Sequence, residues 1–453
     1  MVEQRSKQDN RRPVGAGQDR RALAVLGLIV LGFAVLVQTL QGVGAPEASD
    51  AVTVVEIWGW NLAAESLDYL TPAFEQAHPD IDVQVKVSGA MVQTRLLLAL
   101  AGGVGAPGAC QLQEREAPKY VSTGRLADMS RWAQRYADAF PAASWASCTM
   151  EGGIYAIPWD IGPCAVFYKR WVFDQYGLDP NTIETWDDFI AMGRELHERS
   201  GGRVRMLPLS VSGLGDMFQI LMQQNGGGVF DAEGRIVVHQ PRNVEALRLI
   251  RKLLDSGICA PLGVSSDEGL ASYNGDSIAC YPGAVWLMHN IKDKSASRAG
   301  QWGVFRLPAI EPGGLRNSNI GGSVLVVPDQ GFASQAAQKF VEYALCTVDA
   351  QLTQYEKYGL FPAYLPAHED PRFDQPDPFF GGQRVAKLFA QDYTRVTPMV
   401  RTRDWADAER YLNESLSVWG IQRQDERAFL MEVARMLNHR LGREIAPVEG
   451  GQP

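Results

Sequence analysis

The sequence carries little positive charge for its length. Its 453 residues include 43 Lys and Arg against 52 Asp and Glu, which sets the formal net charge at −9 and the pI near 5.3. Proteins that bind nucleic acids concentrate Lys and Arg to neutralise phosphates. This composition disfavours a polyanionic ligand, and we expect no nucleic-acid partner.

Histidine and cysteine are also scarce, with six of each. No Cys-x-x-Cys pair occurs and the histidines lack the spacing of zinc ligands, so we expect no metal and no cofactor. The cysteines are Cys110, Cys148, Cys164, Cys259, Cys280 and Cys346. Several lie in apolar strings, where buried free thiols fit the sequence as well as disulfides do.

The common catalytic motifs are absent as well. The sequence contains no G-x-S-x-G, no H-E-x-x-H and no G-x-x-x-x-G-K-[ST], which disfavours the enzyme classes that depend on them. A secreted glycoside hydrolase stays open as the alternative function, because it needs only two carboxylates at a suitable separation. The candidate carboxylates are Glu56, Glu65, Glu151, Asp160 and Asp216. No internal repeat favours a structural or adhesive protein.

The length of the chain predicts more than one folded unit. A chain of 453 residues exceeds what one hydrophobic core usually supports, so two lobes or domains are expected. The share of hydrophobic residues, 46%, and of charged residues, 21%, is ordinary for a globular protein. Most of the chain should therefore fold in water.

The basic residues gather before an apolar run at residues 22–40. They are Arg5, Lys7, Arg11, Arg12, Arg20 and Arg21. This pattern predicts an export signal over residues 1–48, with the rest of the chain in the periplasm or at the outer face of the cytoplasmic membrane. The run is longer than the roughly 7–15 residues of a cleaved signal core and near the roughly 18 of a membrane span, so a signal peptide and a signal anchor both stay open. No cysteine stands near its end to carry a lipid.

From residue 52 on, strand patterns alternate with helix patterns. Residues 52–58 are β-rich, residues 81–87 alternate polar and apolar, and Leu67, Leu70 and Phe74 lie between them at helical spacing. A β-α-β unit therefore opens the folded part, and we expect a largely parallel sheet. Further helices are predicted after Thr185, at residues 244–254 and 334–345, and before Gly442, and further strands at residues 303–307 and 323–327. The fold class is α/β.

Aromatic residues stand beside polar ones at several predicted loops. The stretches are Trp58-Gly59-Trp60-Asn61, residues 155–160, Trp286-Leu287-Met288-His289-Asn290 and Phe361-Pro362-Ala363-Tyr364. A pyranose ring has apolar C–H faces that lie on an aromatic plane and a rim of hydroxyls that donate and accept hydrogen bonds. A single tryptophan is more often part of a core, but this clustering favours a carbohydrate ligand.

The order of short motifs along the chain resembles a known family. The motifs are Ile57-Trp58-Gly59-Trp60, Pro72-Ala73-Phe74-Glu75-Gln76-Ala77-His78-Pro79-Asp80-Ile81, Tyr155-Ala156-Ile157-Pro158-Trp159-Asp160, Phe167-Tyr168-Lys169, Thr185-Trp186-Asp187-Asp188-Phe189, Asn225-Gly226-Gly227 and Gly321-Gly322-Ser323. In this order they resemble the family 1 extracellular solute-binding proteins, the group that includes maltose-binding protein and many oligosaccharide-binding components of ABC importers.

The resemblance implies a two-lobed periplasmic-binding-protein-like fold of type II, with a hinge and a ligand cleft between the lobes. By this likeness the first lobe comprises residues 52–160 and 306–347, the second comprises residues 161–305 and 348–446, and residues 447–453 form a tail. The cleft would close around a sugar, and ABC permease subunits would read the closed state. We expect a monomer that binds its ligand without turnover.

The same resemblance implies which residues contact the sugar. They are Trp60, Asn61, Gln113, Trp159, Asp160, Asp216, Trp286, Gly322 and Tyr364. Asp160 would bond to sugar hydroxyls near the hinge, Trp286 would stack on a ring, and Gly322 would let the backbone approach the ligand. No catalytic residue and no metal ligand is expected.

Overall fold

The predicted β-α-β unit begins at the first β-rich segment of the described chain. The computed structural model describes residues 52–89, 91–150, 152–264, 266–330, 332–391 and 393–449, so the predicted export signal at residues 1–48 lies outside the described part. β1 (Thr53–Gly59) and β2 (Ile81–Val87) are parallel, and α2 (Asn61–Ala77) connects them. The apolar stripe of α2 is buried, as its spacing predicts.

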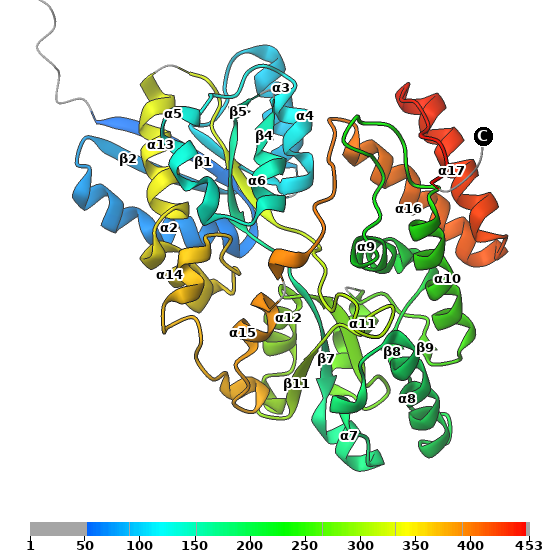
Figure 1. Ribbon diagram of the computed structural model, residues 1–453. Helices are drawn as coiled ribbons and strands as arrows, with labels where there is room; N and C mark the ends of the chain where they lie inside the picture. The colour runs from blue at the N-terminus through cyan, green and yellow to red at the C-terminus, as the bar shows by residue number, and fades with distance from the viewer. Residues whose placement is uncertain are drawn as a thin grey trace, which may run out of the picture. The chain divides into compact units, whose positions relative to one another are not determined.

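A five-stranded sheet, in the order β2-β1-β3-β12-β6, forms the first lobe (Figure 1). Its other strands are β3 (Ala109–Gln113), β6 (Ala156–Asp160) and β12 (Ser323–Val326). β12 comes from far along the chain and is antiparallel to both of its neighbours. The carboxyl ends of β1, β3 and β6 therefore lie near the beginning of β12, and loops from four distant segments meet there.

The second lobe is built on an antiparallel sheet in the order β10-β7-β11. Its strands are β7 (Cys164–Lys169), β10 (Cys280–Ala284) and β11 (Trp302–Arg306). Two short pairs accompany the main sheets, β4 (Thr149–Met150) with β5 (Gly153–Ile154) and β8 (Leu207–Pro208) with β9 (Cys259–Ala260). The main second sheet is thus not parallel, so among the described strands the expected parallel pairing holds for β1, β2 and β3 and for the short pair of β8 and β9.

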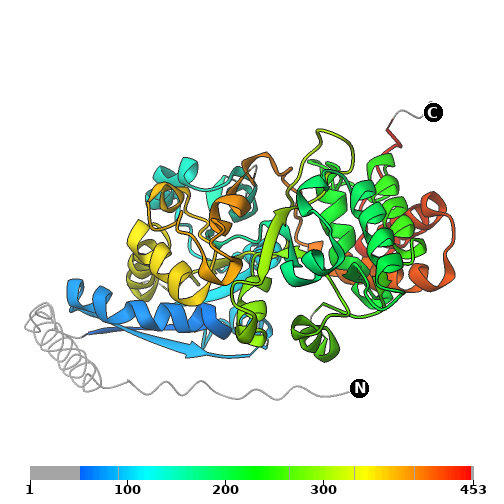
Figure 2. The ribbon, with the colours of Figure 1, turned by 90° about the horizontal axis from the view of Figure 1, so that it is seen from below.

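Helices surround both sheets (Figures 1 and 2). In the first lobe they are α2, α3 (Val92–Gly102), α4 (Ala117–Val121), α5 (Ser130–Ala133), α6 (Ala142–Cys148), α13 (Phe332–Leu345) and α14 (Val348–Tyr358). In the second they are α7 (Arg170–Tyr176), α8 (Trp186–Arg199), α9 (Leu214–Gln224), α10 (Pro241–Asp255), α11 (Asp267–Ala271), α12 (Leu287–Lys294), α15 (Val385–Ala390), α16 (Trp405–Gln422) and α17 (Glu426–Leu441).

Local sequence signals explain where several helices begin and end. Thr185 caps α8 by accepting a bond from the backbone N–H of Asp188, whose side chain in turn accepts one from the backbone of Thr185. This reciprocal capping box satisfies two backbone donors that a helix start leaves open. α17 ends at Gly442, which adopts the left-handed conformation that glycine tolerates best.

Two of the chain segments that cross between the lobes are in close contact. Residues 161–163 lead from β6 to β7, and residues 320–322 lead back to β12. The backbone N–H of Ile320 donates to the Gly162 carbonyl over 2.9 Å. A Cβ atom at Gly162 would lie 1.9 Å from the Ile320 oxygen, so only glycine fits at this crossing.

The packing places the lobe boundaries differently from the expected residues 306 and 348. The segment after β11 stays with the second lobe, since the Ser318 carbonyl accepts a bond from the backbone of Cys164 over 3.0 Å. α14 packs on α2 and α13 in the first lobe, as Figure 2 also shows. Buried side chains on α14 need a partner surface, and α2 provides it. The expected tail at residues 447–453 begins in contact with the body, where Pro447 and Glu449 bond with Gln240.

All six cysteines are free, and five of them are buried. Burial raises the pKa of every thiol, that of the half-buried Cys259 to about 12. Since the thiolate is the reactive form, we expect Ellman's reagent to react with none of them in the native protein and with all six after unfolding without reductant. A count below six after unfolding would reveal a disulfide and contradict this prediction.

Within the described ranges, no helix is both long enough and apolar enough to cross a membrane.

Candidate ligand-binding site

A cavity of about 480 Å³ lies between the carboxyl ends of the first lobe's strands and the start of α9 and α12 in the second lobe. It brings together most of the residues expected at the site. The ones that line it are Trp60, Asn61, Gln113, Asp160, Asp216, Trp286 and Gly322. Its volume falls within the range of about 300–1,000 Å³ that is typical of small-molecule sites.

Two expected site residues lie elsewhere. Trp159 is only 1% exposed, and its indole Nε1 donates to Gln354 Oε1 over 2.6 Å. The β6–β12 pairing skips Trp159, and its ring packs in the core of the first lobe. Tyr364 packs against the rings of Phe140 and Tyr136, with centroids 5.5 and 6.3 Å away. Neither residue lines the cavity, because the Trp159 ring fills the core of the first lobe and the half-buried Tyr364 ring packs against that core.

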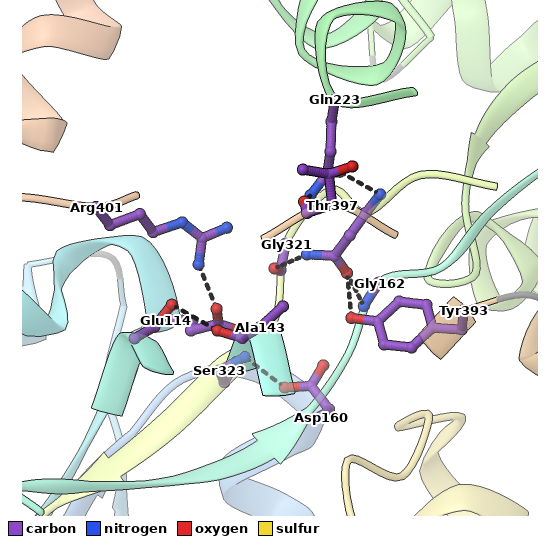
Figure 3. Close-up of polar contacts among 12 residues, drawn as sticks. Glu114, Ala143, Asp160, Gly162, Gln223, Gly321, Ser323, Tyr393, Thr397 and Arg401 are labelled. Carbon is purple, nitrogen blue, oxygen red and sulfur yellow. Dashed lines mark hydrogen bonds and ion pairs between the residues drawn. The ribbon is translucent and has the colours of Figure 1, made fainter. Parts of the chain in front are cut away.

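A chain of hydrogen bonds ties together the strand ends beneath the cavity. Gln111 Oε1 accepts the backbone N–H of Trp60 over 2.9 Å, and Gln111 Nε2 donates to Ser323 Oγ over 3.2 Å. The backbone N–H of Ser323 then donates to Asp160 Oδ1 over 2.7 Å, as Figure 3 shows. These bonds hold the loop after β1 and the Asp160 carboxylate in fixed positions.

Burial perturbs the two carboxylic acids of the cavity. Removal from water raises the pKa of Asp160 to about 6, although its bonds from Ser323 favour the ionised form and oppose the shift. Burial also raises the pKa of Asp216, which lies in the first turn of α9, while the nearby Arg115 opposes that shift. No ion pair to either carboxylate occurs within the residues that the structure describes, so both can accept bonds from a ligand.

Trp286 presents part of its ring to the cavity. Its side chain follows β10 and is 38% exposed, an unusual exposure for tryptophan in this chain. The indole Nε1 donates to the Ile320 carbonyl over 3.3 Å, which fixes the ring beside the crossing segment. Gly321 and Gly322 follow with φ of +97° and +101°, and a Cβ atom at Gly322 would lie 2.9 Å from Glu114 Oε2. Glycine is therefore needed where the backbone lines the cavity.

Asn319 joins the two crossing segments through polar contacts. Its Oδ1 accepts the backbone N–H of Gly162 over 2.9 Å and the hydroxyl of Tyr393 over 3.0 Å. Its own backbone N–H donates to Gln223 Oε1 over 2.7 Å. Figure 3 shows Gly162, Tyr393 and Gln223 converging on this point. The crossing is thus held by side chains from the second lobe.

Residues 60–346 match the family described as bacterial extracellular solute-binding proteins. The chain belongs to this family. It is therefore an extracytoplasmic binding protein rather than an enzyme, and the glycoside-hydrolase alternative finds no support.

Several relatives of this solute-binding protein bear names of sugar ligands. The arabinooligosaccharide-binding protein of Halalkalibacterium halodurans is 26% identical over 342 residues, which covers 73% of this chain and 76% of the relative. The lactose-binding protein of Rhizobium radiobacter is 26% identical over 357 residues, which covers 74% and 81%. The binding protein of B. animalis subsp. lactis Bl-04, solved with β-1,6-galactobiose, is 25% identical with a TM-score of 0.72 and covers 87% of this chain and 100% of its own.

The fold is also that of the sugar-binding protein MalE from Xanthomonas citri. That structure has a TM-score of 0.75 at 19% identity and covers 86% of this chain and 98% of its own. The predicted family resemblance and the two-lobed fold class are confirmed.

Sequence reasoning missed several residues that line the cavity of this solute-binding protein. They include Arg115, Gln219, His289, Asn290, Tyr358 and Arg401. Asn290 and His289 belong to a stretch that the aromatic clustering had already singled out, and Arg115 follows the strand end at Gln113. Arg401 lies in an irregular segment with no pattern to mark it, and only the tertiary structure brings it to the cavity.

Two further cavities adjoin the first. One, of about 310 Å³, lies within the second lobe and shares Asp216, Trp286 and Ile320 with it. The other, of about 460 Å³, shares His289, Tyr358 and Gly359. Residues of the central cavity therefore also border two neighbouring spaces.

In the described part of the chain, no group of three or more His, Cys, Asp or Glu side chains is placed to hold a metal ion.

Proposed function

We propose that this protein binds a neutral oligosaccharide in the central cavity and delivers it to the permease subunits of an ABC importer. The observation that carries the proposal is the exposed ring of Trp286 in one cavity with the carboxylates of Asp160 and Asp216. An aromatic face and unpaired carboxylates match the two chemical faces of a sugar, its C–H groups and its hydroxyls.

The charges around the cavity support a neutral ligand. Arg115 and Arg401 both line it, but each forms an ion pair with a glutamate, Glu409 and Glu114 respectively. The positive charges of the wall are therefore already balanced. Asp160 and Asp216, in contrast, have no such partner among the described residues, so the wall carries an excess of negative charge. A sugar acid or a phosphorylated sugar would meet net repulsion here.

The adjoining cavities support a ligand of more than one sugar unit. Both share lining residues with the central cavity, and Trp286 borders two of the three spaces. Two relatives are named for sugars of two or more units, arabinooligosaccharides and lactose, and a third was solved with β-1,6-galactobiose.

Closure of the two lobes on the ligand would provide the signal to the permease. In this proposal the first lobe comprises residues 53–160 and 323–373, where Phe373 packs on Phe361, and the second comprises residues 163–320 and 377–449, where Asp377 pairs with Lys292. A ligand that contacts both lobes stabilises the closed state in proportion to its preference for it. The apolar run at residues 22–40 would direct export of the protein. It would then either be cleaved or hold the protein at the membrane, and the protein would act as a monomer.

Thermal unfolding of the purified protein against a sugar panel tests this function. The panel includes arabinotriose, lactose, β-1,6-galactobiose and, as the anionic comparison, galacturonic acid oligomers. A ligand at 100 times its Kd should stabilise the fold by about 2.7 kcal/mol, and the neutral sugars should do so without release of reducing ends. A shift with the anionic oligomers alone, or with none of the sugars, would reject the proposal.

The raised pKa of Asp160 predicts pH-dependent binding. Sugar hydroxyls that donate to the ionised carboxylate lower its pKa from about 6 toward its ordinary value, so affinity should rise as pH increases from 5 to 7. A decrease of one pKa unit on binding corresponds to about a tenfold gain in affinity, and Asp216 acts in the same direction. Titration calorimetry at several pH values measures the effect.

Asp160→Asn is the control for this pH dependence, because the amide does not titrate. Its affinity should change much less between pH 5 and 7, with only the contribution of Asp216 left. An equally steep profile in the variant would assign the titration to another group. The folding stability of the unliganded protein depends on pH in the opposite direction. The raised pKa of Asp160 stabilises the folded state below the ordinary pKa near 3.8, and this stabilisation is lost as pH rises through about 6.

A further inference from the structure

Two reciprocal ion pairs join the first lobe to the C-terminal segment. Both begin at the 3-10 turn η1 (Glu114–Glu116), which follows β3. Arg115 Nη1 pairs with Glu409 Oε1 on α16 over 3.0 Å, and Glu114 pairs with Arg401, which precedes α16. Figure 3 shows Arg401 reaching toward Glu114. The same turn therefore supplies one acid and one base to the facing segment.

The pair of Glu114 with Arg401 is deeply buried. Their side chains are 4% and 5% exposed, against 30% for Arg115 and 16% for Glu409. Burial of opposite charges costs desolvation energy, and the pair stabilises the fold only when its remaining donors and acceptors also find partners. Those remaining atoms consequently show where a further partner is needed.

Three atoms of these pairs are buried without a hydrogen-bond partner in the described chain. They are Arg401 Nε, Arg115 Nε and Glu114 Oε2. Both arginines line the central cavity, and a Cβ at Gly322, another lining residue, would lie 2.9 Å from Glu114 Oε2. Of the three side chains, Arg115 and Arg401 line the central cavity where the ligand is expected, and Glu114 lies directly behind the lining residue Gly322.

The chemistry of these atoms selects the kind of group that would bind them. Each arginine has its charge balanced by its glutamate, so it offers an N–H donor without a free positive charge. Such a donor suits the oxygen of a hydroxyl, which both donates and accepts. Adjacent hydroxyls of a sugar present this combination repeatedly.

We propose that Arg115 and Arg401 are ligand-binding residues that donate to sugar hydroxyls, and that the segment carrying Arg401 and Glu409 forms a third wall of the site. This inference rests on the proposed function. Both residues of the segment lie beyond residue 346, where the match to the family ends. The C-terminal part of the chain would thereby help to decide which sugar is bound.

Titration calorimetry on full-length variants tests the assignment, with arabinotriose, lactose and β-1,6-galactobiose as probes. Arg115→Gln and Arg401→Gln should each raise Kd by about tenfold or more, the cost of removing a donor to a buried ligand. Glu409→Gln breaks the same ion pair as Arg115→Gln but leaves the donor in place, and should raise Kd by less than about threefold. Arg410→Gln, an exposed change on α16, should leave Kd unaltered.

Equal effects of Arg115→Gln and Glu409→Gln would overturn the proposal, because they would show that the pair acts only by linking the lobes. Unchanged affinity in both arginine variants would overturn it as well. If Arg401→Gln unfolds because Glu114 is left buried and unpaired, the more exposed Arg115 decides the question. Failure of the wild-type protein to bind any of the three sugars would reject the proposed function itself, and this inference with it.

Discussion

Replacement of Trp286 by alanine is expected to weaken sugar binding by about 10- to 100-fold. The ring borders two of the three neighbouring cavities, and its Nε1 donates to the Ile320 carbonyl. Loss of the ring removes the apolar platform for a sugar face and leaves the polar contacts in place. Since the side chain is 38% exposed, its removal should cost little stability. Calorimetric Kd and the melting temperature of the unliganded protein measure both effects.

Two further variants make this expectation specific. Trp286→Phe keeps an aromatic face and should recover most of the lost affinity. Trp145→Ala removes a ring that stacks on Phe140 instead, with centroids 5.5 Å apart, and should not change Kd. Unchanged Kd in Trp286→Ala, or a loss that Trp286→Phe does not reduce, would remove the ring from the site.

Substitution of Gly162 by alanine is expected to destabilise the protein by about 3 kcal/mol. The added methyl would lie 1.9 Å from the Ile320 carbonyl oxygen, a contact with backbone that no side-chain rotation relieves. The two crossing segments would have to separate, and the bond from Ile320 N–H to the Gly162 carbonyl would be lost. Urea unfolding measures the change, and sugar affinity should fall with it because Asn319 and Gly321 move with the crossing.

Gly102→Ala is the matched control for this change. Gly102 ends α3, and a Cβ atom there meets nothing within 4 Å. The substitution should therefore be neutral or slightly stabilising, because alanine restricts the unfolded chain. Similar unfolding midpoints for Gly162→Ala and the wild-type protein would show that the crossing is less constrained than the contact implies.

Local patterns predicted the secondary structure closely wherever a single segment determines it. The strand at residues 81–87 has the predicted bounds, and α8 begins at the predicted cap. Alternation and helical spacing report which side of a segment is buried, and capping depends on residues within one turn. Seven of the nine expected contact residues line the cavity, and five of these stand at strand ends of the first sheet, which meet in space because they share one edge of the sheet.

The misplaced residues depend on packing between distant segments. Trp159 neighbours Asp160 in sequence, yet the skipped pairing with β12 and the amide of Gln354 keep its ring in the core. α14 lies on the first lobe because α2 and α13 offer it an apolar surface. The sequence of one segment predicts neither a residue that is skipped in strand pairing nor the surface on which an amphipathic helix packs.

The sequence by itself determined the α/β elements, the family and the aromatic and acidic residues suited to a sugar, because these follow from local composition and motif order. Only the tertiary structure decided the lobe boundaries and the two ion pairs that bring Arg115 and Arg401 to the cavity. Glu114 and Arg401 are separated by 287 positions in the chain. Long-range pairing of charges depends on how the lobes pack, and no local spacing encodes it.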